Sequence, residues 1–413
     1  MMPPLELRRA AAAVRPHVEM VLVRMATESN NAGNPDLLRP LVAHLVHVTL
    51  KSQSRRDAMS AELATALGVH YQLDGNYAEA AKWLHEAWKL RERLLGKEHQ
   101  ETMSSMVSLG IVYGEQARFE EAAEMFQQVY RVRKARLGER HADTVMSLNY
   151  LAESYAAQGR LEQAARMFEQ ALQDMCELVG ESDVNTIAIL NNLATAYIYM
   201  NLLENAEPLA IRVWEWRRAV LGEQKPDTIM ALNNLAVLYG KQGKLEKAEP
   251  LLSKVLQLQR IIRGEQHPDT AFGMNNLARL YMEQDKYTEA EPLLLEACAL
   301  RKRCLGETHP HTAISMANLG GLYLMQQRYE DAESLLKQAL QIYDRSVVPT
   351  FPEAIRARVV AGDLYAAQGR YAEAEPFYDQ AWRQMMELLG PDHPETEKTS
   401  AKLVSVRAKQ QGM

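Results

Sequence analysis

Two columns of asparagine recur in this chain with a fixed period of about 42 residues. The first column holds Asn149, Asn191, Asn233 and Asn275, and the second, one residue later, holds Asn192, Asn234, Asn276 and Asn318. An asparagine side chain offers both a donor and an acceptor, so it can pair with both polar groups of a peptide backbone. The alternative is that these amides bond neighbouring helices to one another. The columns are therefore candidates either for holding an extended chain or for fixing how the elements stack.

Histidines recur in the same way and raise the question of a metal site. They are His99, His141, His267, His309 and His393. Each falls on a separate connection between elements, about one repeat or more from the next, which is too far apart to share an ion. Several precede a proline, as in His267-Pro268, which is typical of a turn at a helix end. We predict a structural role for these histidines, with no metal site and no cofactor.

A search for catalytic patterns gives no candidate. A phosphate loop requires glycines followed by lysine and then serine or threonine. Gly96-Lys97 is followed by Glu98, and Gly243-Lys244 is followed by Leu245, so neither fits. No pairing of a nucleophile with a base stands out either. We predict that the protein is not an enzyme and has no catalytic residues.

Composition indicates which kind of partner and which cellular location to expect. The chain has 47 basic and 53 acidic side chains, a net charge of -6, which gives no reason to expect a nucleic acid partner. No apolar run approaches the roughly 20 residues of a membrane span, and the N-terminus lacks the pattern of a secretory signal. The 3 cysteines are too few for a disulfide framework. We expect a cytoplasmic protein without a membrane partner.

Tyrosine keeps the same period as the asparagines, eight times in succession from Tyr71 to Tyr365. Three residues before each tyrosine is a glycine or an alanine, and nine residues after each is an alanine. A fixed period of this length indicates one supersecondary unit that is copied and stacked.

The segment from Pro226 to Gly264 shows what one unit contains. Leu232, Leu235, Ala236 and Tyr239 lie on one face of a first helix, here called helix A. Gln242-Gly243 interrupts the pattern, and a second apolar stretch follows as helix B. Glycine, asparagine or aspartate at the turn suits a left-handed residue after a helix. Prolines such as Pro250 are expected near the start of helix B, where a missing N–H costs least.

These residues resemble the tetratricopeptide repeat. Its signature is a pair of leucine and a small residue, then an aromatic residue, then spaced alanines, and the matching residues here are Leu235-Ala236, Tyr239, Ala248 and Val255. The common repeat has about 34 residues. The longer form looks like the repeats of kinesin light chains, and it is also similar to the repeat arrays of bacterial and fungal STAND signalling NTPases. The resemblance covers roughly residues 54–402.

We therefore predict an all-α solenoid of about eight helix-turn-helix repeats, each of about 42 residues, that forms a superhelix. Residues 1–53 are expected to be an N-terminal helical cap or the remnant of an upstream domain. Residues 54–390 should hold the eight repeats, and residues 391–413 a C-terminal capping helix. Such caps would cover the apolar faces of the terminal repeats.

The resemblance also implies a function. Helix A would line a concave groove, and the protein would be a non-enzymatic scaffold that binds an extended peptide or a segment of a partner protein there. The first asparagine column would face solvent in this groove. The candidate peptide-binding residues are Asn149, Asn191, Asn233, Asn275, Glu153, Thr195, Arg279, Lys241, Met230 and Phe272. The alternative is the ligand-sensing C-terminal repeat region of a larger STAND-type NTPase, whose nucleotide-binding module is absent from this sequence.

Overall fold

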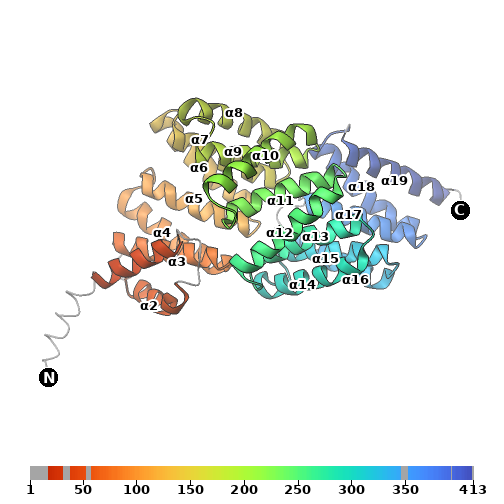
Figure 1. Cartoon of the computed structure of the whole chain (residues 1–413), viewed down its shortest axis with the longest axis horizontal. Coiled ribbons are helices and arrows are strands. Elements are labelled where there is room, and N and C mark those ends of the chain that lie inside the picture. Colours follow the sequence, from red (N-terminus) through yellow and green to blue (C-terminus); the bar gives the residue numbers. More distant parts are fainter. Residues whose placement is uncertain (1–16, 31–37, 53–56, 346–351, 392, 412–413) are drawn as a thin grey trace, which may run out of the picture. The chain divides into compact units, whose positions relative to one another are not determined.

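The computed structural model describes residues 17–30, 38–52, 57–345, 352–391 and 393–411. All regular secondary structure in these ranges is helical, and the prediction of an all-α solenoid of repeats is confirmed (Figure 1). Contacts divide the chain into two compact units, Met1–Val132 and Arg133–Met413. Each unit has buried apolar clusters of its own.

The first unit begins with helical residues 17–30, a short 3₁₀ helix at Arg39–Leu41 and helix α2 at Val42–Ser52. Two repeats follow, each made of a helix A and a helix B. Their helices are α3 (Ala58–Leu73), α4 (Tyr77–Leu95), α5 (Gln100–Glu115) and α6 (Phe119–Leu137), the last of which continues past the unit boundary.

The second unit continues with the same pairing of helices A and B. Its helices A are α7 (Ala142–Ala157), α9 (Val184–Tyr199), α11 (Pro226–Lys241), α13 (Pro268–Glu283), α15 (Pro310–Met325) and α17 (Pro352–Ala367). Its helices B are α8 (Leu161–Val179), α10 (Leu203–Val220), α12 (Leu245–Arg263), α14 (Tyr287–Leu305), α16 (Tyr329–Arg345) and α18 (Tyr371–Leu388). A last helix, α19 (Pro394–Gln411), packs on α18 in the register of a further helix A.

Part of the predicted N-terminal segment lies outside the described residues. The sequence predicts a helix over Leu5–Met25 and a loop over Asn30–Pro35, and of these only residues 17–30 are described, as helix. Pro352 is the first residue of α17. The capping roles of residues 1–53 and 391–413 stay predictions.

The column of small residues lets helix A approach helix B within a repeat. A Cβ atom added at Gly320 would lie 2.9 Å from Leu336 Cγ, and one added at Gly362 would lie 2.7 Å from Tyr378 Cε1. Both partners are almost fully buried in helix B. Larger side chains in this column would force the two helices apart, because the interior is close-packed.

The turn between helices A and B depends on a single left-handed residue. Its φ is positive at Gly75, Gly159, Gly243 and Gly369, and also at Asn201 and Asp285, as the sequence predicts. Two further turns use Ala117 (φ 58°) and Gln327 (φ 60°). A left-handed conformation costs an ordinary L-residue about 1–2 kcal/mol, so these two turns are strained.

We expect Gln327→Gly to raise the free energy of unfolding by up to about 1 kcal/mol, since glycine adopts this conformation without a steric penalty. Chemical denaturation would measure the change. Gly369→Ala, at the equivalent turn, is the matched reverse substitution and should destabilise. The strain argument fails if both substitutions shift stability in the same direction.

The position predicted for the prolines of helix B is wrong. Pro208, Pro250, Pro292 and Pro376 lie inside their helices rather than at the first position. Pro250, for example, is five residues beyond Leu245, the first residue of α12. Each such proline removes one hydrogen bond from the second turn of helix B, which the packing of the repeat must offset.

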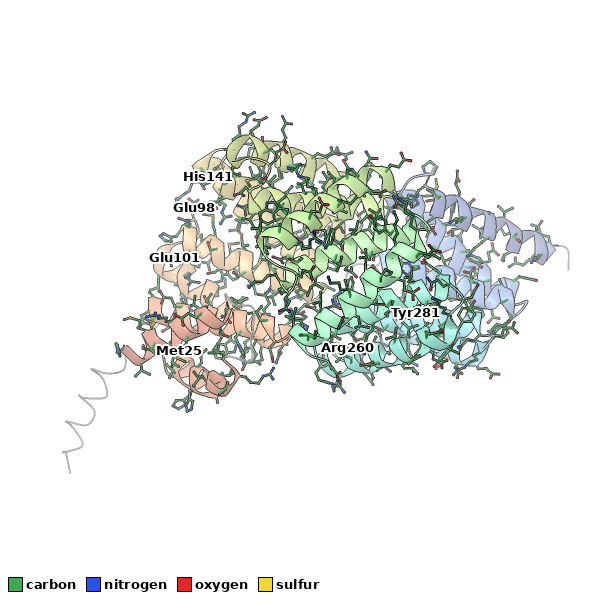
Figure 2. The ribbon with its side chains drawn as sticks, in the orientation of Figure 1. Met25, Glu98, Glu101, His141, Arg260 and Tyr281 are labelled. Atoms are coloured by element: carbon green, nitrogen blue, oxygen red, sulfur yellow. The ribbon has the colours of Figure 1, made fainter. Side chains whose placement is uncertain are left out.

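A recurring polar contact, here called the clasp, joins successive repeats. A glutamate of helix B accepts hydrogen bonds from a glutamine and a cation at the next turn. Glu249 accepts from Gln284 (3.0 Å) and Lys286 (2.9 Å), and Glu291 accepts from Gln326 (3.0 Å) and Arg328 (2.8 Å). The cation also lies over the tyrosine of its own repeat, as Lys286 does over Tyr281, labelled in Figure 2.

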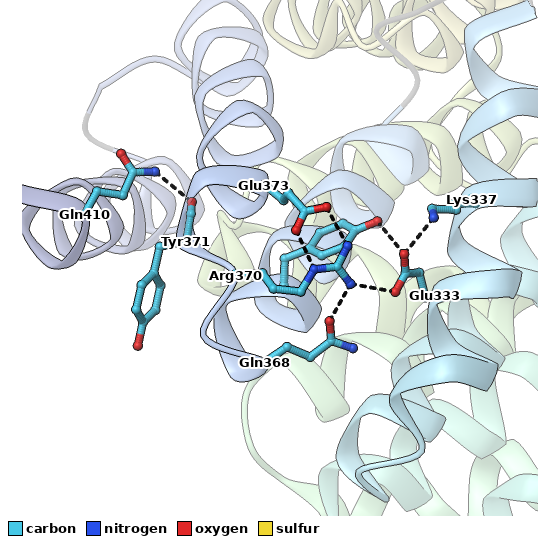
Figure 3. A network of polar contacts seen from close by, with 8 residues as sticks. Glu333, Lys337, Gln368, Arg370, Tyr371, Glu373 and Gln410 are labelled. Carbon is cyan, nitrogen blue, oxygen red and sulfur yellow. Dashed lines mark hydrogen bonds and ion pairs between the residues drawn. The ribbon is translucent and has the colours of Figure 1, made fainter. Parts of the chain in front are cut away.

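Figure 3 shows the corresponding contact between α16 and the turn before α18, in which Gln368 accepts from Arg370 instead of donating to the glutamate. Glu333 accepts from Arg370 at 2.9 Å and from the hydroxyl of Tyr365 at 3.2 Å, and Lys337 pairs with the same carboxylate. On α19, Arg407 pairs with Glu375 at 2.7 Å. The tyrosine column thus contributes to a contact between repeats as well as to packing within one.

Candidate functional site

The two asparagine columns form a hydrogen-bonded ladder between successive helices A. The amide nitrogen of each second-column asparagine donates to the amide oxygen of the first-column asparagine one repeat earlier. The pairs are Asn192 to Asn149 (3.1 Å), Asn234 to Asn191 (3.3 Å), Asn276 to Asn233 (2.9 Å) and Asn318 to Asn275 (3.0 Å). Asparagine is suited to this position because it donates and accepts at once.

The expectation that the first column faces solvent is wrong. The residues of this column, Asn149, Asn191, Asn233 and Asn275, are between 2% and 7% exposed. Asn275 also donates to Ser315 at 2.9 Å and to the Ala271 carbonyl at 2.8 Å. The oxygens of all four amides accept hydrogen bonds in the ladder and the side chains are buried, so this column does not face a groove in this conformation.

The repeated histidines cap the first turn of helix A. The Nδ1 atoms of His99, His141, His267, His309 and His393 each accept the backbone N–H two residues later. This confirms the structural role predicted for them, because the first N–H groups of a helix lack partners within it. Within the part of the chain that the structure describes, no group of three or more metal-ligating side chains comes together.

The inner face of helix A is defined by the residues that follow the second asparagine column at helical spacing. Asn276, Arg279 and Glu283 lie at i, i+3 and i+7 on α13, so they share one face. Asn234, Val237 and Lys241 occupy the same positions on α11. One turn earlier on this face stand Met230 and Phe272, which are 54% and 46% exposed.

A cavity of about 600 Å³, here called the chamber, lies against this inner face in the second unit. One wall comes from helices A and includes Tyr199, Val237, Lys241, Asn276, Arg279 and Glu283. The opposite wall comes from the last three helices and includes Ile355, Arg356, Val359, Met385, Glu395 and Lys398. Segments far apart in the sequence, such as those of Lys241 and Arg356, therefore line one space.

The structure places the predicted site residues in four different environments. Lys241 and Arg279 line the chamber. Met230 and Phe272 are exposed on the inner face but are not part of the chamber wall. Thr195 belongs to the ladder, since its hydroxyl accepts from Asn234 at 3.0 Å. Glu153 is exposed on α7. Whether any of them binds a peptide stays a prediction.

Positive charge accumulates in the chamber. Its walls hold the cations Lys241, Arg279, Arg356 and Lys398 and the acids Glu283 and Glu395. Arg279 lies 4.0 Å from Glu283, and Lys398 lies 3.4 Å from Glu395. Among the described residues, Lys241 and Arg356 have no carboxylate within 4.0 Å. Neither cation forms an ion pair, although Glu283 and Glu395 act on Lys241 from a greater distance.

The titration of the chamber residues follows from this arrangement. Burial, together with the nearby Arg279 and Arg356 cations, lowers the pKa of Lys241 to about 8. The Glu353 carboxylate and, next, burial raise the pKa of Tyr199 to about 12. Burial and the Arg356 cation also lower the pKa of Arg279. Apart from the half-buried Arg279, the charged side chains of both walls remain exposed to solvent.

The repeat pattern of the sequence identifies residues on only one wall of the chamber. Arg356, Glu395 and Lys398 carry no signal of their own, since α17 departs from the asparagine pattern and α19 follows the last complete repeat. Tyr199, by contrast, stands one repeat period before Lys241 and so occupies the same position of helix A. The period of the repeat could have identified Tyr199, but not the residues of the opposite wall.

The fold and the inner-face chamber define a helical-repeat solenoid of the kind that presents binding surfaces. Models of the tetratricopeptide repeat match residues 59–135, 144–185, 185–261, 230–303, 269–345 and 323–387. The chain belongs to the tetratricopeptide repeat family. Proteins of this family are typically non-enzymatic scaffolds for protein interactions.

Solved structures show what the fold is similar to. Kinesin-light-chain-like repeats from Podosopora anserina are 24% identical over 48% of this chain and 93% of theirs, with a TM-score of 0.37. BtubC (BKLC) from P. vanneervenii is 19% identical over 60% of this chain and 92% of its own, with a TM-score of 0.41. A Rap protein complexed with Competence and Sporulation Factor is 12% identical over 84% and 98%, with a TM-score of 0.56.

At these identities, the likeness concerns the fold alone. Comparison with curated protein sequences found no match. Within the described residues, none of the helices combines the length and the hydrophobicity needed to cross a bilayer. The relation to STAND-type NTPases stays a prediction.

Proposed function

We propose that the protein is a non-enzymatic scaffold that binds an extended segment of a partner protein along the inner face of helices A in its second unit. The observation that carries the proposal is the chamber, which is lined by half-exposed and exposed side chains of several repeats. The Rap protein of similar fold was solved in complex with Competence and Sporulation Factor, which is consistent with ligand binding by a solenoid of this kind.

The chemistry of the inner face suits such a segment. Met230 and Phe272 offer exposed apolar surface, and Asn234 and Asn276 follow one turn later on the same helices. Apolar anchors next to polar groups are typical of interaction surfaces, in which a few large side chains contribute most of the affinity. The first asparagine column is not part of this proposal, since it is buried in the ladder.

We expect Phe272→Ala to weaken binding of a cognate peptide by more than about 1 kcal/mol, because an exposed aromatic side chain on a binding face acts as an anchor. The peptide would come from selection of a displayed random library against the full chain, and calorimetry would measure its affinity. Ile261→Ala is the matched control, since Ile261 is 65% exposed on helix B. Equal losses for both variants, or no loss for Phe272→Ala, would contradict the proposed face.

A further inference from the structure

The chamber contains two lysines in different surroundings. Lys241 is the last residue of α11, and among the residues that the structure describes it forms no ion pair. Lys398, on α19, pairs with Glu395 at 3.4 Å. Both lysines line the same space and both are exposed to solvent, so a small dissolved molecule can reach either amine. Their reactivity should therefore depend on the charges next to each of them.

The charges around Lys241 come from three other helices. Arg279 on α13 and Arg356 on α17 oppose its protonated form, whereas Glu283 on α13 and Glu395 on α19 favour it. Each of the two carboxylates also has another cation within 4.0 Å. Gathering cations in this way disfavours a charged ammonium.

These surroundings favour the neutral amine of Lys241. Partial burial and, next, the Arg279 and Arg356 cations lower its pKa from 10.5 to about 8. Near neutral pH, a shift of that size raises the fraction of neutral amine by on the order of a hundredfold over that of an ordinary lysine. The neutral amine is the form that carries a free lone pair and attacks an electrophilic carbon.

Carbon dioxide is an electrophile whose product suits the chamber. The amine nitrogen of Lys241 bonds to the carbon of carbon dioxide, and one C–O π bond opens to give a carboxylate. The nitrogen then releases one proton to water, which leaves a carbamate, so that no oxidant or reductant is required. Guanidinium groups donate charge-assisted hydrogen bonds to oxygens of this kind.

We propose that Lys241 is a site of carbamate formation by carbon dioxide, and that Arg279 and Arg356 stabilise the carbamate from opposite walls of the chamber. The cations that repel the ammonium would attract the product. At Lys398 the same reaction would place an anion beside Glu395, so we expect little adduct there. The charge of the chamber would thus respond to dissolved carbon dioxide. This proposal does not depend on the proposed function, because it requires no partner segment.

Chemical trapping measures the carbamate directly. The full chain is equilibrated near neutral pH with carbon-13-labelled carbon dioxide, triethyloxonium converts carbamates to stable esters, and peptide mass spectrometry locates the label. Lys241 should carry at least about tenfold more label than Lys398 or Lys225. Lys225, which is exposed and directly precedes α11, represents an ordinary lysine. Equal labelling of the three lysines, or no label at Lys241, would overturn the proposal.

Arg356→Gln tests the stabilising group. The substitution removes a cation that opposes the ammonium and attracts the carbamate, so both effects should lower the label at Lys241, by about fivefold or more. Arg356→Lys keeps the charge and should retain most of the label. Arg383→Gln is the matched control, since Arg383 is exposed on α18 and is not part of the chamber wall. Thermal melts would establish that the variants fold. Full labelling in Arg356→Gln would overturn the stabilising role.

The pH dependence separates Lys241 from an ordinary lysine. Carbamate formation releases two protons from an ammonium but one from a neutral amine. At a fixed, low partial pressure of carbon dioxide, the label should rise about a hundredfold per pH unit below about pH 8 and about tenfold above it. His393, with a lowered pKa, stays neutral in this range, and Tyr199, with a pKa raised to about 12, stays protonated. A rise at Lys241 without this change of slope, as expected at Lys225, would contradict the proposal.

Discussion

Leu294→Ala should lower the free energy of unfolding of the second unit by about 3 kcal/mol, the cost of a cavity left by a buried leucine. Leu294 is 0% exposed on α14 and belongs to the cluster that contains Ala278, Ala290 and Leu322. Those neighbours come from α13, from α14 itself and from α15, so the cavity would loosen contacts both within a repeat and between repeats.

The effect of this substitution should also be local. Repeats interact mainly with their nearest neighbours, so hydrogen-exchange protection should fall first in α13 to α16 and only later in α7 and α8. Leu295→Ala is the matched control, because the adjacent Leu295 is 46% exposed. A uniform loss of protection through α7 to α18, or an equal loss of stability in Leu295→Ala, would argue against this assignment.

Asn275→Ala should lower the free energy of unfolding by about 1–3 kcal/mol, because it leaves buried polar partners without their hydrogen bonds. Asn275 accepts from Asn318 at 3.0 Å and donates to Ser315 at 2.9 Å. Ser315 in turn is bound by the buried Arg301 at 3.1 Å. The substitution therefore disturbs a connected network between α13, α14 and α15 rather than one isolated pair.

Denaturation of four variants would measure this coupling. Asn275→Ala, Asn318→Ala and the double variant form a cycle, in which the two changes should be non-additive because the residues are in contact. Asn185→Ala is the control, since Asn185 lies in the first turn of α9, outside the ladder. If Asn275→Ala weakens peptide binding while leaving stability unchanged, the first column serves the ligand and its structural role is wrong.

The sequence by itself determined the repeat, its pairing of helices A and B and the turn between them. Three features encode requirements that are met within one unit. They are the period of about 42 residues, the small residue at Gly320 and the left-handed turn residue at Gly243. A helix face, a close approach and a turn depend on neighbours within the same unit, so a pattern in the sequence can reveal them. The same holds for His267, whose ring caps the helix that starts one residue later.

Only the tertiary structure decided which asparagine column is buried. Asn275 and Asn276 are adjacent, and successive residues of a helix point about 100° apart, so one of them turns into the stack and the other toward the inner face. Which one does so depends on how the next helix A packs, and the periodic pattern is the same in either case. No pattern within a single repeat reveals the chamber either. Lys241 on α11 and Arg356 on α17 both line it because small rotations between successive repeats add up along the solenoid. That sum depends on every interface between the repeats.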